Sequence, residues 1–165
     1  MPRPLTDAEQ ALVARVRHVA HTLYDGVVTP HRSCGIAMAE TFGRATPPYQ
    51  ALRRGGITGC GECGVLMGAR MVLGELLGDP DPTGAVTPVL REAMEELDRG
   101  WPTRLDRGAA EGSSMVCRTL TAPFGEDFRG PARHRFCTQL AADMAELVAE
   151  ILIRRDALPE PPEVG

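Results

Sequence analysis

The sequence predicts an all-α protein: a single-domain helical bundle of about five helices with a central apolar, glycine-containing helix. Apolar residues recur at helical spacing in several segments that end at glycine or proline, and no segment shows the strict alternation of a strand. The length of 165 residues suits one hydrophobic core. We expect the helical domain to span residues 1–157, followed by a disordered tail rich in proline and glutamate at residues 158–165.

The N-terminal part of the chain predicts two helices. Thr6 and Glu9 have the spacing of a capping box, so the first helix is expected to begin after Thr6. Its apolar pattern ends at Gly26, and glycine commonly follows the last turn of a helix. A second, shorter helix is expected over residues 33–42, with Cys34 in its first turn.

The middle of the chain predicts a loop and then the central helix. Residues 44–59 contain several prolines and glycines, which indicates a loop. Residues 63–77 are almost entirely apolar or small, a composition typical of a buried helix. Gly64, Gly68 and Gly74 would let another backbone or a cofactor approach this helix closely. Tight packing against a second helix is the alternative explanation for these glycines.

The C-terminal half predicts further helices separated by a loop. Thr87, followed by a proline, is a typical helix start, and Gly100 is expected to end that helix. Residues 103–114 show no periodicity and indicate a loop. A short helix is expected over residues 115–120, and a long amphipathic helix over residues 132–154.

The composition excludes several classes of function. All 18 basic residues are arginine, which removes chemistry that requires a lysine. A net charge of -4 gives no bulk attraction to nucleic acid or membranes, and no apolar run is long enough to cross a bilayer. The N-terminus lacks the pattern of a secretory signal, so we expect a cytoplasmic protein whose thiols are reduced.

The cysteines are the residues most indicative of function. In a reducing compartment, an odd number of them favours a metal or redox site over structural disulfides. Cys60 and Cys63 form a CxxC pair, whose thiols can bind one metal or cluster or form a disulfide. In a tight glycine loop around such a pair, backbone N–H groups can donate hydrogen bonds to sulfur. The remaining cysteines are Cys34, Cys117 and Cys137.

Other residue patterns give weaker signals. His134 lies three residues before Cys137, where its imidazole could tune the thiol. No dinucleotide-binding, Walker or serine-hydrolase motif is present. With 4% aromatic residues, stacking surfaces for single-stranded nucleic acid are not expected.

The order of the cysteines resembles a redox-active family named for a lone cysteine, a Gly-Cys-Ala-x-x-Gly box and two further cysteines. Here the lone cysteine is Cys34, and the box is residues 59–64 with a glycine in place of the alanine. The two further cysteines are Cys117 and Cys137. The resemblance covers roughly residues 30–152, which is most of the chain.

The cysteine of the box can be aligned with Cys60 or with Cys63, so either residue could be the family cysteine. The resemblance implies a helical domain with a redox or metal-binding role. Related domains are associated with split-Soret cytochromes, which carry an iron–sulfur centre beside haem. This chain has no CxxCH sequence, so covalent haem attachment is not expected.

We therefore expect a small redox protein that binds a [2Fe–2S] or [4Fe–4S] cluster and serves in electron transfer or redox chemistry. One alternative is a metal-free oxidoreductase in which Cys60 and Cys63 cycle between dithiol and disulfide, and a second is a structural zinc protein. The sequence does not specify an electron partner or substrate, and the apolar helix would serve a homodimer contact as readily as a core. The candidate metal ligands are Cys34, Cys60, Cys63, Cys117 and Cys137, and the glycines expected beside a cofactor are Gly59, Gly61, Gly64 and Gly68.

Overall fold

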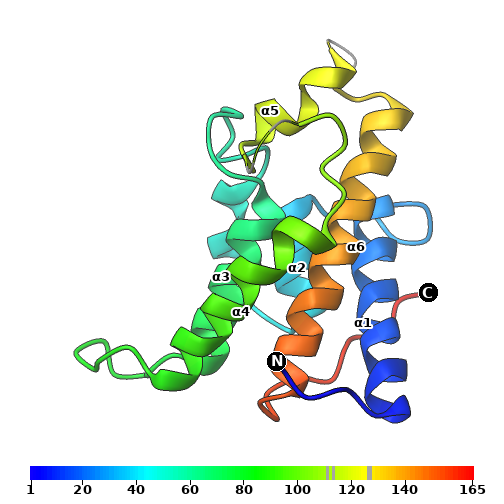
Figure 1. The fold of residues 1–165 in the computed structure, drawn as a ribbon. Helices are drawn as coiled ribbons and strands as arrows, with labels where there is room; N and C mark the ends of the chain where they lie inside the picture. The colour runs from blue at the N-terminus through cyan, green and yellow to red at the C-terminus, as the bar shows by residue number, and fades with distance from the viewer. Residues whose placement is uncertain (111, 113, 126–127) are drawn as a thin grey trace.

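The computed structural model describes residues 1–110, 112, 114–125 and 128–165, and these residues form helices and loops without a β-strand (Figure 1). The predicted all-α class is therefore confirmed. Two short 3-10 helices add to the expected number of elements, and the first of them lies in the segment expected to be a loop. In chain order the elements are α1 (Asp7–Asp25), α2 (Cys34–Thr41), η1 (Pro47–Leu52), α3 (Gly64–Leu77), α4 (Pro88–Arg104), α5 (Cys117–Thr121), η2 (Ala122–Phe124) and α6 (Pro131–Ile153).

The capping box predicted at the start of α1 is present. The backbone N–H of Glu9 donates to Thr6 Oγ1 at 3.2 Å, and the backbone N–H of Thr6 donates to Glu9 Oε2 at 2.8 Å. At the other end, Gly26 adopts φ 76° and its N–H donates to the Thr22 carbonyl. At both ends of α1, backbone groups that have no hydrogen-bond partner within the helix therefore find one outside it.

Replacing Thr6 with alanine is expected to lower the free energy of unfolding by about 1 kcal/mol, because the Glu9 N–H loses its acceptor. Urea denaturation followed by circular dichroism measures the change. Thr103→Ala is the control, since Thr103 is an exposed threonine near the end of α4 and its loss is expected to cost less than about 0.5 kcal/mol. Equal effects of the two substitutions would contradict a capping role for Thr6.

Helix α6 organises the core. It packs against α1, α2, α3 and α4, and α1 runs beside it along much of its length (Figure 1). Its fully buried residues include Met144, Val148 and Ile151. The predicted apolar helix, α3, is buried among α2, α4 and α6. Together these helices fix the positions of the segments that carry the cysteines.

Helix α4 extends past Gly100, where the sequence predicted its end, and continues to Arg104. Gly100 lies against α6, so close that an added Cβ would be 3.0 Å from Leu147 Cδ1. Trp101 is 9% exposed, and burying this large side chain offsets the poor helix propensity of the glycine. Pro102 stands near the helix end, where a missing N–H removes only one backbone hydrogen bond.

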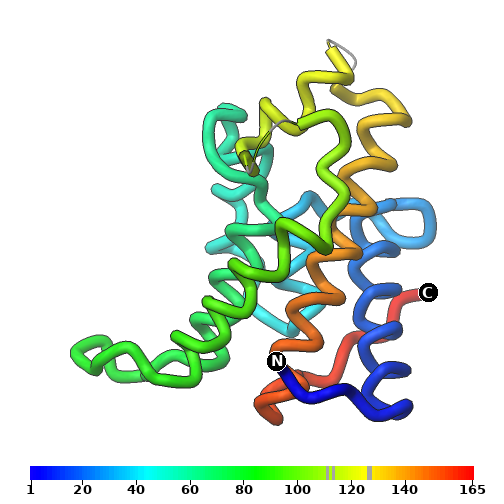
Figure 2. The backbone as a smooth tube through the Cα atoms, in the orientation of Figure 1, coloured from blue at the N-terminus to red at the C-terminus, as the bar shows by residue number. Residues whose placement is uncertain are grey.

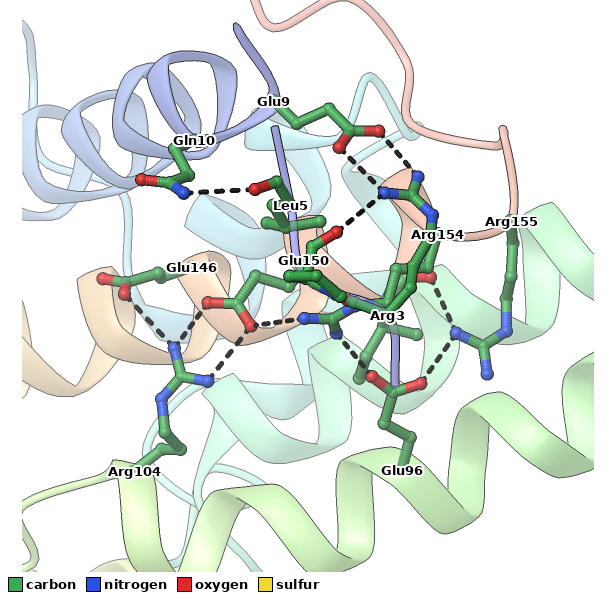
Figure 3. Close-up of polar contacts among 12 residues, drawn as sticks. Arg3, Leu5, Glu9, Gln10, Glu96, Arg104, Glu146, Glu150, Arg154 and Arg155 are labelled. Atoms are coloured by element: carbon green, nitrogen blue, oxygen red, sulfur yellow. Dashed lines mark hydrogen bonds and ion pairs between the residues drawn. The ribbon is translucent and has the colours of Figure 1, made fainter. Parts of the chain in front are cut away.

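Arginine–glutamate pairs hold together the end of the bundle where α6 finishes (Figure 3). Glu96 of α4 accepts hydrogen bonds from Arg154 at 2.7 Å and from Arg155 at 2.8 Å. Arg104 donates to Glu150 of α6 at 2.7 Å. The side chains of Glu96 and Arg154 are 14% and 15% exposed, so the pair is shielded from solvent.

The C-terminal residues 158–165 contain no helix and lie beside α1 (Figure 2). Glu160 pairs with Arg15 of α1 at 2.9 Å, and Leu158 and Val164 pack against the core. The composition of this tail does not indicate these contacts. None of the described helices is long and apolar enough to span a membrane.

Candidate functional site

Four of the five cysteines line one cavity of about 300 Å3: Cys34, Cys63, Cys117 and Cys137. Each comes from a different element. Cys34 is the first residue of α2, Cys63 immediately precedes α3, Cys117 is the first residue of α5, and Cys137 lies in the second turn of α6. The fold therefore gathers residues that are far apart in the sequence at one end of the bundle.

The two cysteines of the CxxC pair have different surroundings. Cys63 is 8% exposed and lines the cavity. Cys60 is exposed on the loop before α3 and is not among the described residues of the cavity wall. The structure thus favours the register of the family box in which Cys63 joins the other three cysteines. Cys60 is then an additional surface thiol.

Backbone hydrogen bonds bring Cys63 and Cys117 together. The N–H of Cys63 donates to the Met115 carbonyl at 2.6 Å, and the N–H of Cys117 donates to the Gly61 carbonyl at 2.9 Å. These bonds surround an isolated antiparallel bridge between Glu62 and Val116. Figure 2 shows the corresponding approach of the chain between α4 and α6 to the loop before α3. The distance between the two cysteines is therefore set by main-chain contacts.

The glycines near the cysteines make close contacts with protein atoms. An added Cβ on Gly64 would be 2.6 Å from the Leu52 carbonyl oxygen and still closer to Cys34 Sγ, and one on Gly68 would be 3.0 Å from Met38 Cβ. The wall of the cavity includes Gly64, whereas the other three glycines predicted beside a cofactor are not among its described lining residues. Of those three, Gly59 adopts φ 78°, and an added Cβ on Gly61 would be 2.8 Å from the Gly55 carbonyl oxygen.

Three of the four cavity thiols, those of Cys34, Cys63 and Cys117, are hard to ionise when no metal is bound. Burial raises the pKa of Cys34 and of Cys63, and it raises the pKa of Cys117 to about 11. Negative charge on the neighbouring cysteines adds to each increase. At Cys34 the backbone N–H groups of Gly35, Arg54 and Gly64 oppose this increase in pKa by favouring the thiolate. A positively charged metal centre would supply the stabilisation that four thiolates need.

The raised pKa of Cys117 predicts how the stability of the metal-free protein depends on pH. Between pH 9 and pH 11 the unfolded chain has released the Cys117 proton while the folded protein retains it. Folding stability is therefore expected to fall as the pH rises through this range. Thermal unfolding of metal-free protein at several pH values measures the slope. Cys117→Ser is expected to have a shallower slope, and identical slopes would contradict the raised pKa.

Tyr24 and Arg133 form a polar pair in the cavity wall beside Cys137. Arg133 Nη1 donates to the Tyr24 hydroxyl at 3.0 Å, and Arg133 Nε donates to the Phe128 carbonyl. Burial and the nearby Cys137 raise the pKa of Tyr24. Tyr24 therefore remains a neutral phenol that can donate a hydrogen bond within the cavity.

His134 and His31 contact α1 rather than completing a metal site. His134 Nε2 lies 2.8 Å from the Asp25 carbonyl oxygen, and His31 Nδ1 contacts the Tyr24 carbonyl. The rings of both histidines pack against the Tyr24 ring. His134 is the residue expected to tune Cys137. Its Nε2 atom instead contacts the last residue of α1.

The cavity wall is positively charged, a feature that the sequence analysis did not identify. Four arginines line it, and no aspartate or glutamate is among the described lining residues. The arginines come from two segments that are far apart in the chain. The adjacent Arg53 and Arg54, before the CxxC pair, were the only local signal in the sequence. Their closeness to residues 129–133 depends on the fold. The four are Arg53, Arg54, Arg129 and Arg133.

The four cysteines share the wall of one cavity. Within the described parts of the chain, no group of three or more His, Cys, Asp or Glu side chains is arranged to hold one metal ion. A zinc ion needs its sulfur ligands at about 2.3 Å from one centre. In a [4Fe–4S] cluster each of the four thiolates binds a different iron, and in a [2Fe–2S] cluster two thiolates bind each iron, so the four sulfurs are spread more widely than around one ion. The four cavity thiols therefore supply the number of donors that a cluster requires, whereas the described residues form no single-ion site.

The helical fold and the cavity lined by cysteines define an all-α cysteine-motif protein. The family model described as "Putative redox-active protein (C_GCAxxG_C_C)" matches residues 31–151. The chain therefore belongs to this family, and the resemblance drawn from the order of its cysteines is confirmed. No curated protein and no solved structure matches the chain.

Proposed function

We propose that this member of the redox-active family holds an iron–sulfur cluster between Cys34, Cys63, Cys117 and Cys137 and acts in electron transfer or redox chemistry. The observation that carries the proposal is that four thiols from four elements line one cavity. Four cysteine ligands are the usual number for [2Fe–2S] and [4Fe–4S] clusters. When bound, the cluster would supply one-electron redox chemistry.

The surrounding residues suit a negatively charged thiolate centre. When Cys34 and Cys63 are thiolates, the backbone N–H groups of Gly35 and Gly64 can donate hydrogen bonds to Cys34, and that of Val65 can donate one to Cys63. Hydrogen bonds of this kind stabilise thiolates and set the reduction potential of a cluster. Arg54 and Arg133 add positive charge to the wall, which offsets the net negative charge of a cluster with four thiolates.

The same thiols bear on where the protein works. All five cysteines are free in the structure. Reduced thiols persist in the cytoplasm, whereas exported proteins tend to form disulfides. We therefore place the protein in the cytoplasm, where the four cavity thiols would remain able to receive iron and sulfide.

Spectroscopy on protein purified without oxygen tests the proposal. We expect a brown protein whose visible absorption bleaches on reduction with dithionite and returns on reoxidation. An electron paramagnetic resonance signal should appear in one of the two states. Colourless protein with stoichiometric zinc would favour the structural zinc alternative. Colourless, metal-free protein that loses two thiols on mild oxidation would favour Cys60 and Cys63 as a dithiol pair.

A further inference from the structure

The arginines around the cavity are a local excess of positive charge. The chain as a whole has 22 acidic and 18 basic residues and a net charge of -4. The described cavity wall nevertheless contains four arginines and no carboxylate. At the other end of the bundle, arginines such as Arg104 and Arg154 are paired with glutamates (Figure 3). Overall composition therefore does not explain the charge of the cavity.

Three of these arginines, Arg53, Arg54 and Arg129, are exposed, whereas Arg133 is half-buried. The guanidinium groups of Arg54 and Arg133 lie 4.2 Å and 4.3 Å from the centre of the Phe128 ring. Stacking on the ring orients each guanidinium. Arg133 already donates from Nε to the Phe128 carbonyl and from Nη1 to the Tyr24 hydroxyl, so its Nη2 and the guanidinium of Arg54 are the groups available for a ligand. The exposed arginines thus surround a route to the buried thiols.

Two further features support a ligand at this place. Arg54 adopts φ 53°, a conformation that costs energy for a residue other than glycine, and its carbonyl accepts the Gly59 N–H at 2.8 Å. The Ser33 hydroxyl lines the cavity, is buried, and has no hydrogen-bond partner among the described residues. A buried hydroxyl without a partner is unfavourable unless a ligand or water satisfies it.

We propose that the cavity admits a small anionic molecule, bearing a carboxylate or phosphate group, as the reaction partner of the thiol centre. The guanidinium fork matches both oxyanions and binds them through paired hydrogen bonds. Because a cluster would fill part of the cavity of about 300 Å3, the space that remains beside the arginines favours a small molecule over a protein segment. This inference rests on the proposed redox function, although the charge selectivity itself does not depend on which metal is bound.

The test compares small oxidants of opposite charge in stopped-flow experiments on the dithionite-reduced protein. We expect ferricyanide, an anion, to oxidise the wild type faster at low salt than hexaammineruthenium(III), a cation, does. Combining Arg53→Gln with Arg129→Gln should lower the ferricyanide rate about tenfold without lowering the rate with the cation. The matched control combines Arg91→Gln with Arg99→Gln, which removes two exposed charges from α4. The start of α4 lies away from the cavity, because Thr87 Oγ1, just before α4, donates a hydrogen bond to the carbonyl of Leu77, at the opposite end of α3 from Cys63.

The result that overturns the proposal is an Arg53→Gln, Arg129→Gln variant in which the ferricyanide rate falls no more than it does in the Arg91→Gln, Arg99→Gln control. Loss of the cluster from the double variant also overturns it, because the arginines would then serve the cluster rather than an incoming anion. Inorganic phosphate and acetate are then tested as competitors of the ferricyanide reaction, and the stronger inhibitor is the oxyanion that the site prefers. If neither of them inhibits the reaction, the proposal is contradicted.

A protein without a cluster gives a separate answer. In that case the same variants are compared in a Cys60→Ser background by the rates at which two disulfides, anionic dithiobis(nitrobenzoate) and cationic cystamine, modify the cavity thiols. Faster modification by the anion that depends on Arg53 and Arg129 would support the anion site while rejecting the cluster. If the arginine substitutions change the rates with the two disulfides equally, both the anion site and the cluster are rejected.

Discussion

Cys63→Ser is expected to abolish iron–sulfur binding, whereas Cys60→Ser leaves the iron content per chain unchanged. Cys63 is 8% exposed and faces the cavity, while Cys60 is exposed on the preceding loop. A cluster that loses one of four thiolates in a buried site loses both a ligand and the charge balance around it. Iron analysis and the visible spectrum of both variants, purified without oxygen, measure the difference.

The comparison is matched because both substitutions exchange one sulfur for oxygen within the same four-residue segment. Circular dichroism establishes that Cys63→Ser still folds, since loss of iron from an unfolded chain would carry no information about ligation. A folded Cys63→Ser protein with a full cluster would contradict the assignment of Cys63 as a ligand. A Cys60→Ser protein without iron would instead place Cys60 in the cluster site.

Gly64→Ala is expected to destabilise the protein by about 1–3 kcal/mol, or more, and to lower the cluster content. An alanine Cβ at this position would be 2.6 Å from the Leu52 carbonyl oxygen and would overlap Cys34 Sγ. The backbone carbonyl cannot move independently of η1, so α2 and α3 would have to separate. Cys34 would then shift away from the other three cysteines. Urea denaturation and iron analysis measure the two effects.

Gly74→Ala in the same helix is the control. An added Cβ at Gly74 has no neighbouring atom within 4 Å, so the gain in helix propensity is expected to stabilise the protein by about 0.5–1 kcal/mol. The cluster content of this variant should equal that of the wild type. If Gly64→Ala were as stable and as rich in iron as Gly74→Ala, the close approach of α2 and α3 at the cysteine cavity would be wrong.

The sequence predicts most of the fold because its helix signals are local. The capping box of Thr6 and Glu9 and the threonine–proline start at Thr87 each operate within one helical turn. The end of α4 was missed for a non-local reason. Gly100 and Pro102 normally end a helix, but contact with Leu147 and burial of Trp101 keep the last turn helical.

The candidate site was predictable only in part. The cysteine order indicated a redox family, but the choice between Cys60 and Cys63 depends on which thiol faces the cavity. That orientation is set by backbone hydrogen bonds to the segment around Cys117, which lies far along the chain. The positively charged wall could not be predicted because Arg54 and Arg133 meet only through their shared contact with Phe128.

The amounts of iron and acid-labile sulfide per chain in anaerobically purified wild-type protein test the central claim most directly. We predict iron and sulfide in equal amounts, two or four of each per chain as the cluster types require. Both should be lost together when one of the four cavity cysteines is replaced. Protein that contains neither iron nor sulfide after anaerobic purification and reconstitution would contradict the claim that these cysteines hold a cluster.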